Sequence, residues 1–435
     1  MEEKYQELVS ILRKETKPAL GCTGPIGYCF IAAHAYDAIG GEIKRIIVEG
    51  GGPKSDDVAF PGSEMLGAEM AFALGAVCGD PNAGLRVLHT VTPEGELKAR
   101  KVAELVEIHP NFERTEIVNR IKVTIETDKG TGVAIMQGAQ DGLIYKERNG
   151  EVLFDEPVSA MNKAGKTPIV KYKIRDFFDF AVNCPIEELS FLLEARELNM
   201  AMAQHVLSNE DVGIGIGRSM MNDENPSTVT RAKAYAAAGC EGRMWGVSLP
   251  IMSVGGKGNV GIASSMPVIS LAMDLGSTEE ELTRALALSF LMAIAVIHRI
   301  GKAPTMCSCE VAASMGVAAG MILLKKGTAQ QVEMAVQDLI PNVFGVVCDG
   351  AKLACALRMA SSTAIAMDAA ALALRNIRLA NNQGVLDVSA DASIDFLGDF
   401  ALHAMVSSDN QLLRKMMEKR KIFPLASMKE RQEKW

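Results

Sequence analysis

The stretch IKVTIETDKGTGVAIMQ, residues Ile121 to Gln137, decides the fold class of this chain. Both of its halves are rich in β-branched residues and alternate in polarity, and the turn sequence Asp128-Lys129-Gly130 separates them. This pattern predicts two antiparallel strands. Two further runs, GLIYKE and EVLFDE, follow around a second turn at Asn149-Gly150. Four such runs in succession predict an antiparallel β meander.

Upstream of the meander, strand and helix patterns alternate. The run EIKRIIVEG at residues 42–50 predicts a strand, and GSEMLGAEMAFALGAVCGD at 62–80 predicts a buried helix. LRVLHTVTP at 85–93 predicts another strand, and KARKVAELVEIHP at 98–110 predicts a helix. Residues 43–172 are therefore expected to form an α+β unit that ends in the meander.

The remainder of the chain has a helical pattern. From Pro185 onward Ala, Met and Leu dominate and aromatic residues are scarce, which favours close helix packing. The first residues carry apolar side chains at helical spacing up to Leu12. We expect an α+β fold in which a mainly α-helical domain, residues 1–42 and 173–435, holds an inserted α+β domain of residues 43–172.

Composition narrows the class of protein. The chain has 435 residues, of which 48% are hydrophobic and 23% charged, with a net charge of −8. No run of Lys and Arg suggests a nucleic-acid or membrane surface. The longest apolar run, Ala285 to Ile297, is too short to span a bilayer, and the polar start MEEKYQELVS is unlike a signal peptide. We expect a cytoplasmic homo-oligomer that binds neither nucleic acid nor membrane.

Nine cysteines are the most informative residues. An odd number in such a chain argues against a disulfide framework. TMCSCEVAASMG at 305–316 and VVCDGAKLACAL at 346–357 form the densest group, and the others are interpreted as small buried side chains apart from Cys22. From spacing alone an iron–sulfur cluster and a set of buried thiols are equally good readings, while zinc usually takes tighter pairs. The dense group consists of Cys307, Cys309, Cys348 and Cys355.

Three glycine-rich stretches are candidate ligand loops. GIGIGRS at 213–219 imitates a dinucleotide fingerprint, but it follows a helical pattern, so we interpret it as a tight interhelix loop. GGKGNVG at 255–261 lacks the Ser or Thr of a phosphate loop, and its backbone N–H groups and Asn259 suit a small anion. EGGGPKSDD at 49–57 is either a similar site using Lys54 or a simple turn.

Four motifs together resemble the L-cysteine desulfidase family, part of the wider L-serine dehydratase alpha-chain group. They are PALGCTGP at 18–25, GGKGNVG, the CSC motif and VVCDGAKLAC, and the resemblance covers nearly the whole chain. It implies a lyase that removes sulfide or water from a small amino acid to give an α-keto acid and ammonia. It also implies an oxygen-sensitive [4Fe-4S] cluster in place of pyridoxal phosphate.

The resemblance also implies roles for particular residues. The cluster cysteines carry over onto Cys348, Cys355 and one member of the CSC motif, for which we choose Cys309 over its rival Cys307. Cys22 matches a cysteine that serves as general base or as a thiol near the cluster. The residues expected to contact the substrate are Thr23, Lys54, Lys257, Gly258 and Asn259.

This chain departs from the family pattern at several positions. Gly24 stands where a glutamate is common, Lys257 stands where a serine is usual, and GAQDG with Gln140 replaces a turn that usually contains histidine. These departures suggest a different substrate, with Lys257 binding an additional anionic group, or a paralogue whose activity has drifted. Two alternatives therefore stay open: a protein that binds a small amino acid or senses redox state, and a structural zinc protein.

Overall fold

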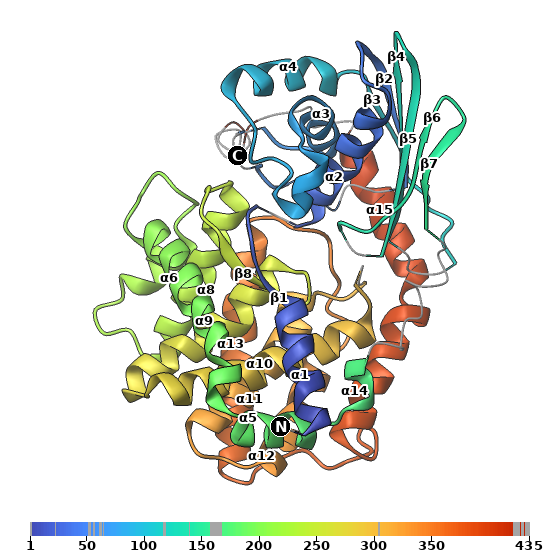
Figure 1. The fold of residues 1–435 in the computed structure, drawn as a ribbon. Helices are drawn as coiled ribbons and strands as arrows, with labels where there is room; N and C mark the ends of the chain where they lie inside the picture. Colours follow the sequence, from blue (N-terminus) through green and yellow to red (C-terminus); the bar gives the residue numbers. More distant parts are fainter. Residues whose placement is uncertain are drawn as a thin grey trace.

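The computed structural model shows two units, one above the other in Figure 1. The upper unit consists of a mixed sheet and the helices that pack beside it, and the lower unit is a bundle of helices. It describes residues 2–21, 23–50, 54, 57–60, 63, 65–115, 119–138, 140–156, 168–302, 305–420, 427 and 430. The protein is α+β, as the sequence predicts.

A six-stranded sheet forms one layer of the upper unit, in the order β3-β2-β4-β5-β6-β7. The predicted meander is confirmed, because β4 to β7 pair antiparallel in succession and Thr127 lies opposite Gly130 at the first turn. Strand β3 pairs parallel to β2 at the other edge. The strands are β2 (Ile43–Gly50), β3 (Val106–His109), β4 (Arg120–Thr127), β5 (Gly130–Gln137), β6 (Leu143–Arg148) and β7 (Glu151–Asp155).

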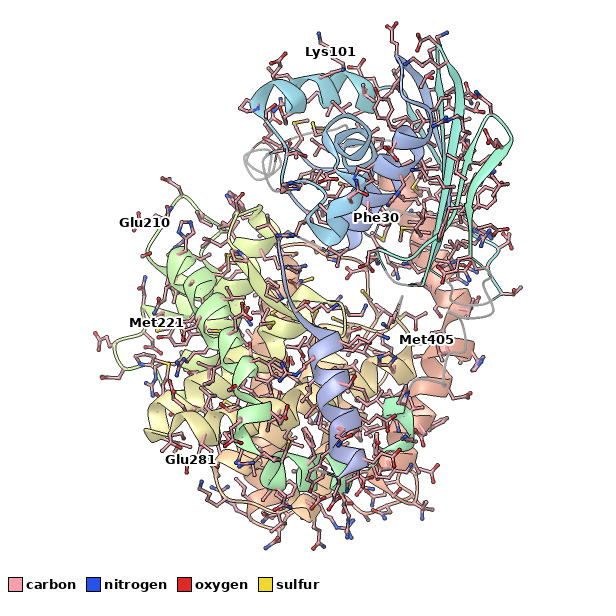
Figure 2. All side chains as sticks on the ribbon, in the orientation of Figure 1. Phe30, Lys101, Glu210, Met221, Glu281 and Met405 are labelled. Atoms are coloured by element: carbon pink, nitrogen blue, oxygen red, sulfur yellow. The ribbon has the colours of Figure 1, made fainter. Side chains whose placement is uncertain are left out.

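Three helices cover one face of this sheet: α2 (Thr23–Ile39), α3 (Ala68–Cys78) and α4 (Pro93–Ala103). Helices α2 and α3 cross closely, because a Cβ on Gly75 would lie 2.1 Å from the carbonyl oxygen of Cys29. Phe30 of α2 is buried inside the unit, whereas Lys101 of α4 lies at its surface (Figure 2). Apolar side chains of all three helices and of β2 and β4 form one hydrophobic core.

The boundary between the two units differs from the expected break at residue 42. Helix α2 joins the core of the sheet, since its small residues let β5 approach so closely that a Cβ on Gly132 would lie 2.2 Å from the carbonyl oxygen of Ala35. At the other end, Ile169 and Tyr172 belong to the core of the helical unit. The core of the upper unit thus begins within α2 and not at residue 43, whereas Val58, Ala59 and Leu66 pack in the core of the lower unit.

Two predicted elements of the upper unit are wrong. The strand expected at 85–93 is replaced by a 3₁₀ helix, η2 (Pro81–Arg86), and turns, because Asp80 caps one side and Thr92 caps the start of α4 on the other. The helix expected at 98–110 ends at Ala103. The rest of that run is β3, whose backbone pairs with the free edge of β2.

The lower unit contains one large hydrophobic core around α10 and α11. These two helices approach closely, because a Cβ on Gly316 would lie 2.4 Å from the carbonyl oxygen of Ser289. A short antiparallel pair, β1 (Thr16–Ala19) and β8 (Ile251–Val254), leads toward the upper unit. The helices are α1 (Glu3–Glu15), α5 (Ile174–Asn183), α6 (Glu194–Leu207), α7 (Ile216–Met221), α8 (Thr228–Trp245), α9 (Gly258–Leu275), α10 (Glu279–Ile300), α11 (Ser308–Leu324), α12 (Ala329–Val343), α13 (Ala354–Leu374), α14 (Ala390–Asp399) and α15 (Val406–Arg420).

Two of the described helices, α10 and α13, have the length and apolar composition of a membrane span. In α10, 89% of the apolar window is buried inside the protein, which matches the expectation of a buried helix for this segment. In α13 the buried share is 44%. A helix at the centre of a large core passes the same test of length and composition, so neither helix by itself indicates a membrane protein.

Candidate functional site

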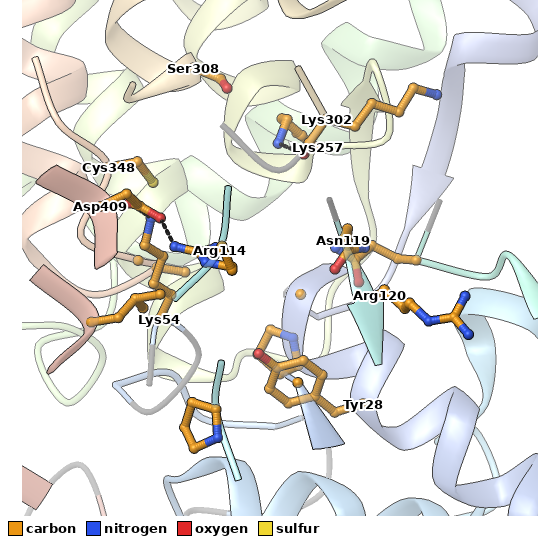
Figure 3. Close-up of a pocket in the computed structure, with 18 of the residues that line it drawn as sticks. Tyr28, Lys54, Arg114, Asn119, Arg120, Lys257, Lys302, Ser308, Cys348 and Asp409 are labelled. Atoms are coloured by element: carbon orange, nitrogen blue, oxygen red, sulfur yellow. Dashed lines mark hydrogen bonds and ion pairs between the residues drawn. The ribbon is translucent and has the colours of Figure 1, made fainter. Parts of the chain in front are cut away.

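A pocket of about 990 Å³ lies between the two units. The upper unit contributes the start of α2 and the polar ends of the meander, and the lower unit contributes the starts of α9 and α11 and the segment before α13. Side chains from both units face one another across it (Figure 3). The pocket brings together seven of the residues expected at the site: Lys54, Lys257, Gly258, Asn259, Cys309, Cys348 and Cys355.

The two cysteine segments meet in a short antiparallel bridge beside this pocket. Met306 lies opposite Val347, the Cys307 N–H donates to the Val346 carbonyl at 2.8 Å, and the Cys348 N–H donates to the Thr305 carbonyl at 2.7 Å. Because side chains alternate along such a pair, Cys307 and Cys348 lie on the same face. Cys307 and Cys348, which are 41 positions apart in the sequence, are thereby placed together at the pocket wall.

The thiols interact with one another and with one arginine. A hydrogen bond from Cys309, helped by the charge of Arg358, lowers the pKa of Cys307 to about 6. The same bond raises the pKa of Cys309, and burial raises the pKa of Cys355 to about 12. Arg358 is held by Asp349, whose Oδ1 accepts from its Nη2 at 3.0 Å. At neutral pH the Cys307–Cys309 pair therefore favours one thiolate beside a cation.

The thiols form a suitable donor set for an iron–sulfur cluster, although they do not form a finished metal site. Among the described residues no group of three or more His, Cys, Asp or Glu side chains stands ready to hold a metal ion. Cys309, Cys348 and Cys355 nevertheless line one pocket together with Cys307, and thiolates are the ligands that such clusters take. The chemistry of the donors fits the group, and the cysteines would have to be drawn together around it.

The glycine loop GGKGNVG connects β8 to α9. Gly255 and Gly256 turn the chain with φ of 61° and 73°, and α9 begins at Gly258. The Asn259 Oδ1 accepts a hydrogen bond from Arg243 Nη1 at 2.6 Å, so its side-chain oxygen is already bound. The Lys257 Nζ donates to the Lys302 carbonyl at 2.7 Å (Figure 3), and burial lowers the pKa of Lys257.

Lys54 reaches the pocket but is engaged in an ion pair across the two units. Its ammonium and the guanidinium of Arg114 bind the two carboxylate oxygens of Asp409 on α15, the arginine at 2.6 Å. The Asp409 side chain is only 4% exposed. Lys54 thus holds α15 against the upper unit through a carboxylate that it shares with Arg114.

Cys22 lies outside the described residues, and so does the placement of the Thr23 side chain. The neighbouring residues are described: Gly21 turns the chain with a φ of 73°, and Gly24 and Pro25 in the first turn of α2 line the pocket. The roles assigned to Cys22 and Thr23 therefore stay predictions.

The fingerprint-like loop GIGIGRS is filled by a carboxylate of the protein. Glu241 of α8 is fully buried and accepts backbone N–H bonds of 2.8 to 3.1 Å. The donors are Ile214, Gly215, Ile216 and Gly217. The site that a phosphate would need is therefore occupied, which agrees with the interpretation of a tight interhelix loop.

Sequence reasoning missed several residues of the pocket, among them Arg243 and Ser308. Arg243 is 2% exposed, and Ser308 Oγ at the start of α11 is buried without a hydrogen-bond partner among the described residues. The only signal for Arg243 is a charged residue in the small apolar helix sequence AYAAAGCEGRMW. Ser308 stands between the two cysteines of the CSC motif, and a serine at this place carries no motif signal of its own.

Four helices begin at the pocket. Residues in the first turns of α2, α9, α11 and α13 line it. Each helix start carries unpaired N–H groups and about half a positive charge. Their convergence makes the pocket favourable for anions, including thiolates and carboxylates.

Comparisons with known proteins agree on one family. The sequence profile of the serine dehydratase alpha chain matches residues 82–414. A protein named UPF0597 from Oleidesulfovibrio alaskensis is 33% identical over 433 residues, covering 97% of this chain and 100% of its own. Relatives with the same name from Phocaeicola vulgatus and Caldanaerobacter subterraneus are each 32% identical, covering 95% of this chain and 98% of their own.

Proposed function

Because this chain belongs to the serine dehydratase alpha chain family, we propose that it is an iron–sulfur-dependent lyase for a small amino acid. The reaction eliminates sulfide or water from a substrate of the L-cysteine or L-serine type and yields an α-keto acid and ammonia. The observation that carries the proposal is the single pocket in which four cysteines from two segments meet the starts of four helices.

Cys309, Cys348 and Cys355 would hold a [4Fe-4S] cluster in this proposal. When bound by three thiolates, such a cluster supplies an iron with an open position that acts as a Lewis acid. The helix starts around the pocket stabilise the negative charge of thiolates and of a substrate carboxylate. Cys307 and Cys355 are buried, and electrostatic interactions are stronger in such low-dielectric surroundings than in water.

In this proposal the thiolate of Cys22 is the general base that removes the α-proton of the substrate. Support comes from its place in the chain, directly before α2, whose first turn lines the pocket. The start of a helix lowers the pKa of a thiol and so favours the thiolate that a general base requires.

Three of the departures from the family pattern lie at this pocket, since Gly24, Gln140 and Lys257 line it. They concern the walls of the site and leave the cluster cysteines in place. This distribution supports retained elimination chemistry on a substrate that differs in its side chain or in an additional anionic group.

An anaerobic metal analysis with an amino-acid panel tests the proposal. The purified or reconstituted protein should be brown, contain about four irons per chain and release an α-keto acid and ammonia from L-cysteine, L-serine or a close analogue. A colourless protein without iron after reconstitution would contradict it. Equimolar zinc without iron would instead indicate the structural zinc protein.

The pocket-wall departures also favour a second candidate, a protein that binds a small amino acid without turnover. Gly24 and Gln140 place no ionisable group where the family motif has one. This candidate predicts that an amino acid raises the melting temperature while no sulfide, ammonia or keto acid appears. Measurable turnover by the cluster-loaded protein would exclude it.

A further inference from the structure

We propose that Arg243 binds the carboxylate of the ligand in this pocket and that Asn259 is its positioning residue. The inference rests on the proposed function for the class of ligand, a small amino or keto acid. It goes beyond that function because it assigns the recognition of the carboxylate to one side chain of α8.

Arg243 is a buried charge that has no counter-ion among the described residues. Arg243 is 2% exposed, and its hydrogen bonds among the described residues go to an amide and a backbone carbonyl, with no carboxylate paired to its guanidinium. Glu241, two residues earlier, does not balance it, because both of its oxygens bind the loop at Ile214 to Gly217. Burying an unpaired charge is costly, and an anionic ligand removes most of that cost.

The guanidinium of Arg243 is held in a fixed orientation. Its Nη1 donates to Asn259 Oδ1 at 2.6 Å, and its Nη2 donates to the Gly21 carbonyl at 2.9 Å. Gly258 packs against its face, so that a Cβ there would lie 2.4 Å from the Arg243 Cζ. A guanidinium has five N–H donors, so these two bonds orient the group and leave donors for a carboxylate.

The other cationic side chains that line the pocket are less suited to bind a ligand carboxylate. Most are already paired with a carboxylate of the protein, and Arg120 on the rim is exposed to water. Lys257 has no carboxylate partner among the described residues, but it is a single ammonium bound to the Lys302 carbonyl. Among these described cations, only Arg243 is buried, has no carboxylate partner and carries a planar guanidinium that can bind both oxygens of a carboxylate. The paired cations are Lys54 and Arg114 with Asp409, Arg358 with Asp349, Lys302 with Glu15 and Lys122 with Glu49.

The start of helix α9 lies beside the guanidinium of Arg243. Asn259 and Gly258 are the first residues of α9, which has 18 residues, and both line the pocket. A carboxylate on Arg243 would also lie near the unpaired N–H groups of this first turn. Asn259 thus changes its role, from direct contact with the substrate to holding the residue that makes the contact.

The test compares Arg243→Gln with Arg231→Gln in the full-length protein. Arg231 lies on the same helix, but it pairs with Asp274 away from the pocket. With the cluster loaded, Arg243→Gln should raise KM for L-cysteine or L-serine at least tenfold at unchanged iron content, because a charged bidentate hydrogen bond is lost. Arg231→Gln should keep the wild-type KM.

An acid and amide pair gives a readout that needs no turnover. In cluster-free wild-type protein, L-serine should raise the melting temperature and L-serinamide should not, whereas Arg243→Gln should respond to neither. Equal stabilisation of the wild type by the acid and the amide would overturn the proposal. This comparison uses the wild type alone, so it remains valid if Arg243→Gln fails to fold. If acid-specific stabilisation depends on Arg243 but no turnover occurs, the proposed lyase fails and this inference stands.

Asn259→Asp is the sharpest variant because it has almost the same shape. Its carboxylate would pair with Arg243 inside the protein. We expect a higher melting temperature and at least a tenfold loss of affinity for the acid, with little change in kcat at saturation. A variant that binds the acid as tightly as the wild type would overturn the positioning role of Asn259.

Discussion

Cys307 and Cys309 are separated only by Ser308, yet the pKa values of their thiols are shifted in opposite directions. Cys307 is 3% exposed and its pKa is lowered to about 6, whereas the pKa of Cys309 is raised by the hydrogen bond that joins them. Cys309 is the second residue of α11, and Cys307 precedes the helix. The choice of Cys309 as a cluster ligand stays a prediction that metal analysis can decide.

Cys309→Ser should lose most of the iron on anaerobic reconstitution, because a cluster thiolate is removed, while Cys307→Ser should keep it. Iron and sulfide content per chain measure the difference. Cys78→Ser is a matched control, since Cys78 is half-buried at the end of α3 and does not line the pocket. Iron retained in Cys309→Ser and lost in Cys307→Ser would reassign the ligand.

Cys22→Ser should bind a normal amount of iron but lose turnover by about a hundredfold or more, because serine is a far weaker base than a thiolate. The absorbance of the cluster and the rate of keto-acid formation measure the two effects separately. Full activity in this variant would exclude the base role of Cys22, and lost iron would make it a cluster ligand.

At the scale of elements, sequence patterns correctly predicted those helices and strands whose formation depends on neighbouring residues. The meander was predictable because alternation and the turns at Gly130 and Gly150 act within a few residues. Strand β3 was not, because Val106 to His109 pair with β2, which lies more than 50 residues earlier. A short run with both patterns takes its structure from the edge that is available to it.

Helix α1 is joined to α10 by a buried carboxylate, which makes stability depend on pH. Glu15 Oε1 lies 3.3 Å from His298 Nε2 and 3.4 Å from Lys302 Nζ. Burial alone would raise the pKa of Glu15, but the bond from His298 and the charge of Lys302 lower it to about 2. The folded pKa lies below the unfolded one, so the stabilisation is complete above about pH 4.5 and disappears as the pH falls toward 2.

Glu15→Gln should therefore lower the free energy of unfolding by about 1 to 3 kcal/mol at pH 7 and flatten its decline between pH 5 and pH 3. Urea unfolding at several pH values measures both effects. Glu3→Gln on the exposed side of the same helix should follow the wild-type curve. An unchanged slope in Glu15→Gln would show that other groups cause the acid sensitivity.

At the scale of the whole molecule, one buried carboxylate connects the two units. Asp409 on α15 binds Lys54 and Arg114 of the upper unit, and Asn410 also donates to the Arg114 carbonyl at 2.9 Å. In Figure 1, α15 runs from the lower unit along the upper one. This contact is therefore one of the links between the two units that flank the pocket.

Asp409→Asn should destabilise the protein by about 3 kcal/mol, because two cations then face a neutral amide. It should also weaken the coupling of the units, so that calorimetry shows two transitions where the wild type shows one. Asp368→Asn on the exposed side of α13 is the control. A single transition at the wild-type temperature would show that the core contacts, and not Asp409, hold the units together.

The site was predictable to the extent that motifs name its residues. The glycine loop and the two cysteine segments were singled out from sequence, and the pocket brings them together. Arg243 and the Asp409 contact were not, because their function depends on partners such as Asn259 and Lys54 that are distant in sequence. A buried charge is visible in a sequence, but whether it is balanced becomes visible only in space.

The loop at Gly213 to Gly217 has a consequence for its order under physiological conditions. A loop that binds a soluble nucleotide gains a stabilisation that depends on the concentration of that metabolite. Here the anion is the Glu241 side chain, which is attached to a helix of the same chain and is always present at a very high effective concentration. Its binding is independent of metabolite levels, so the fingerprint serves as a permanent internal joint between α7 and α8.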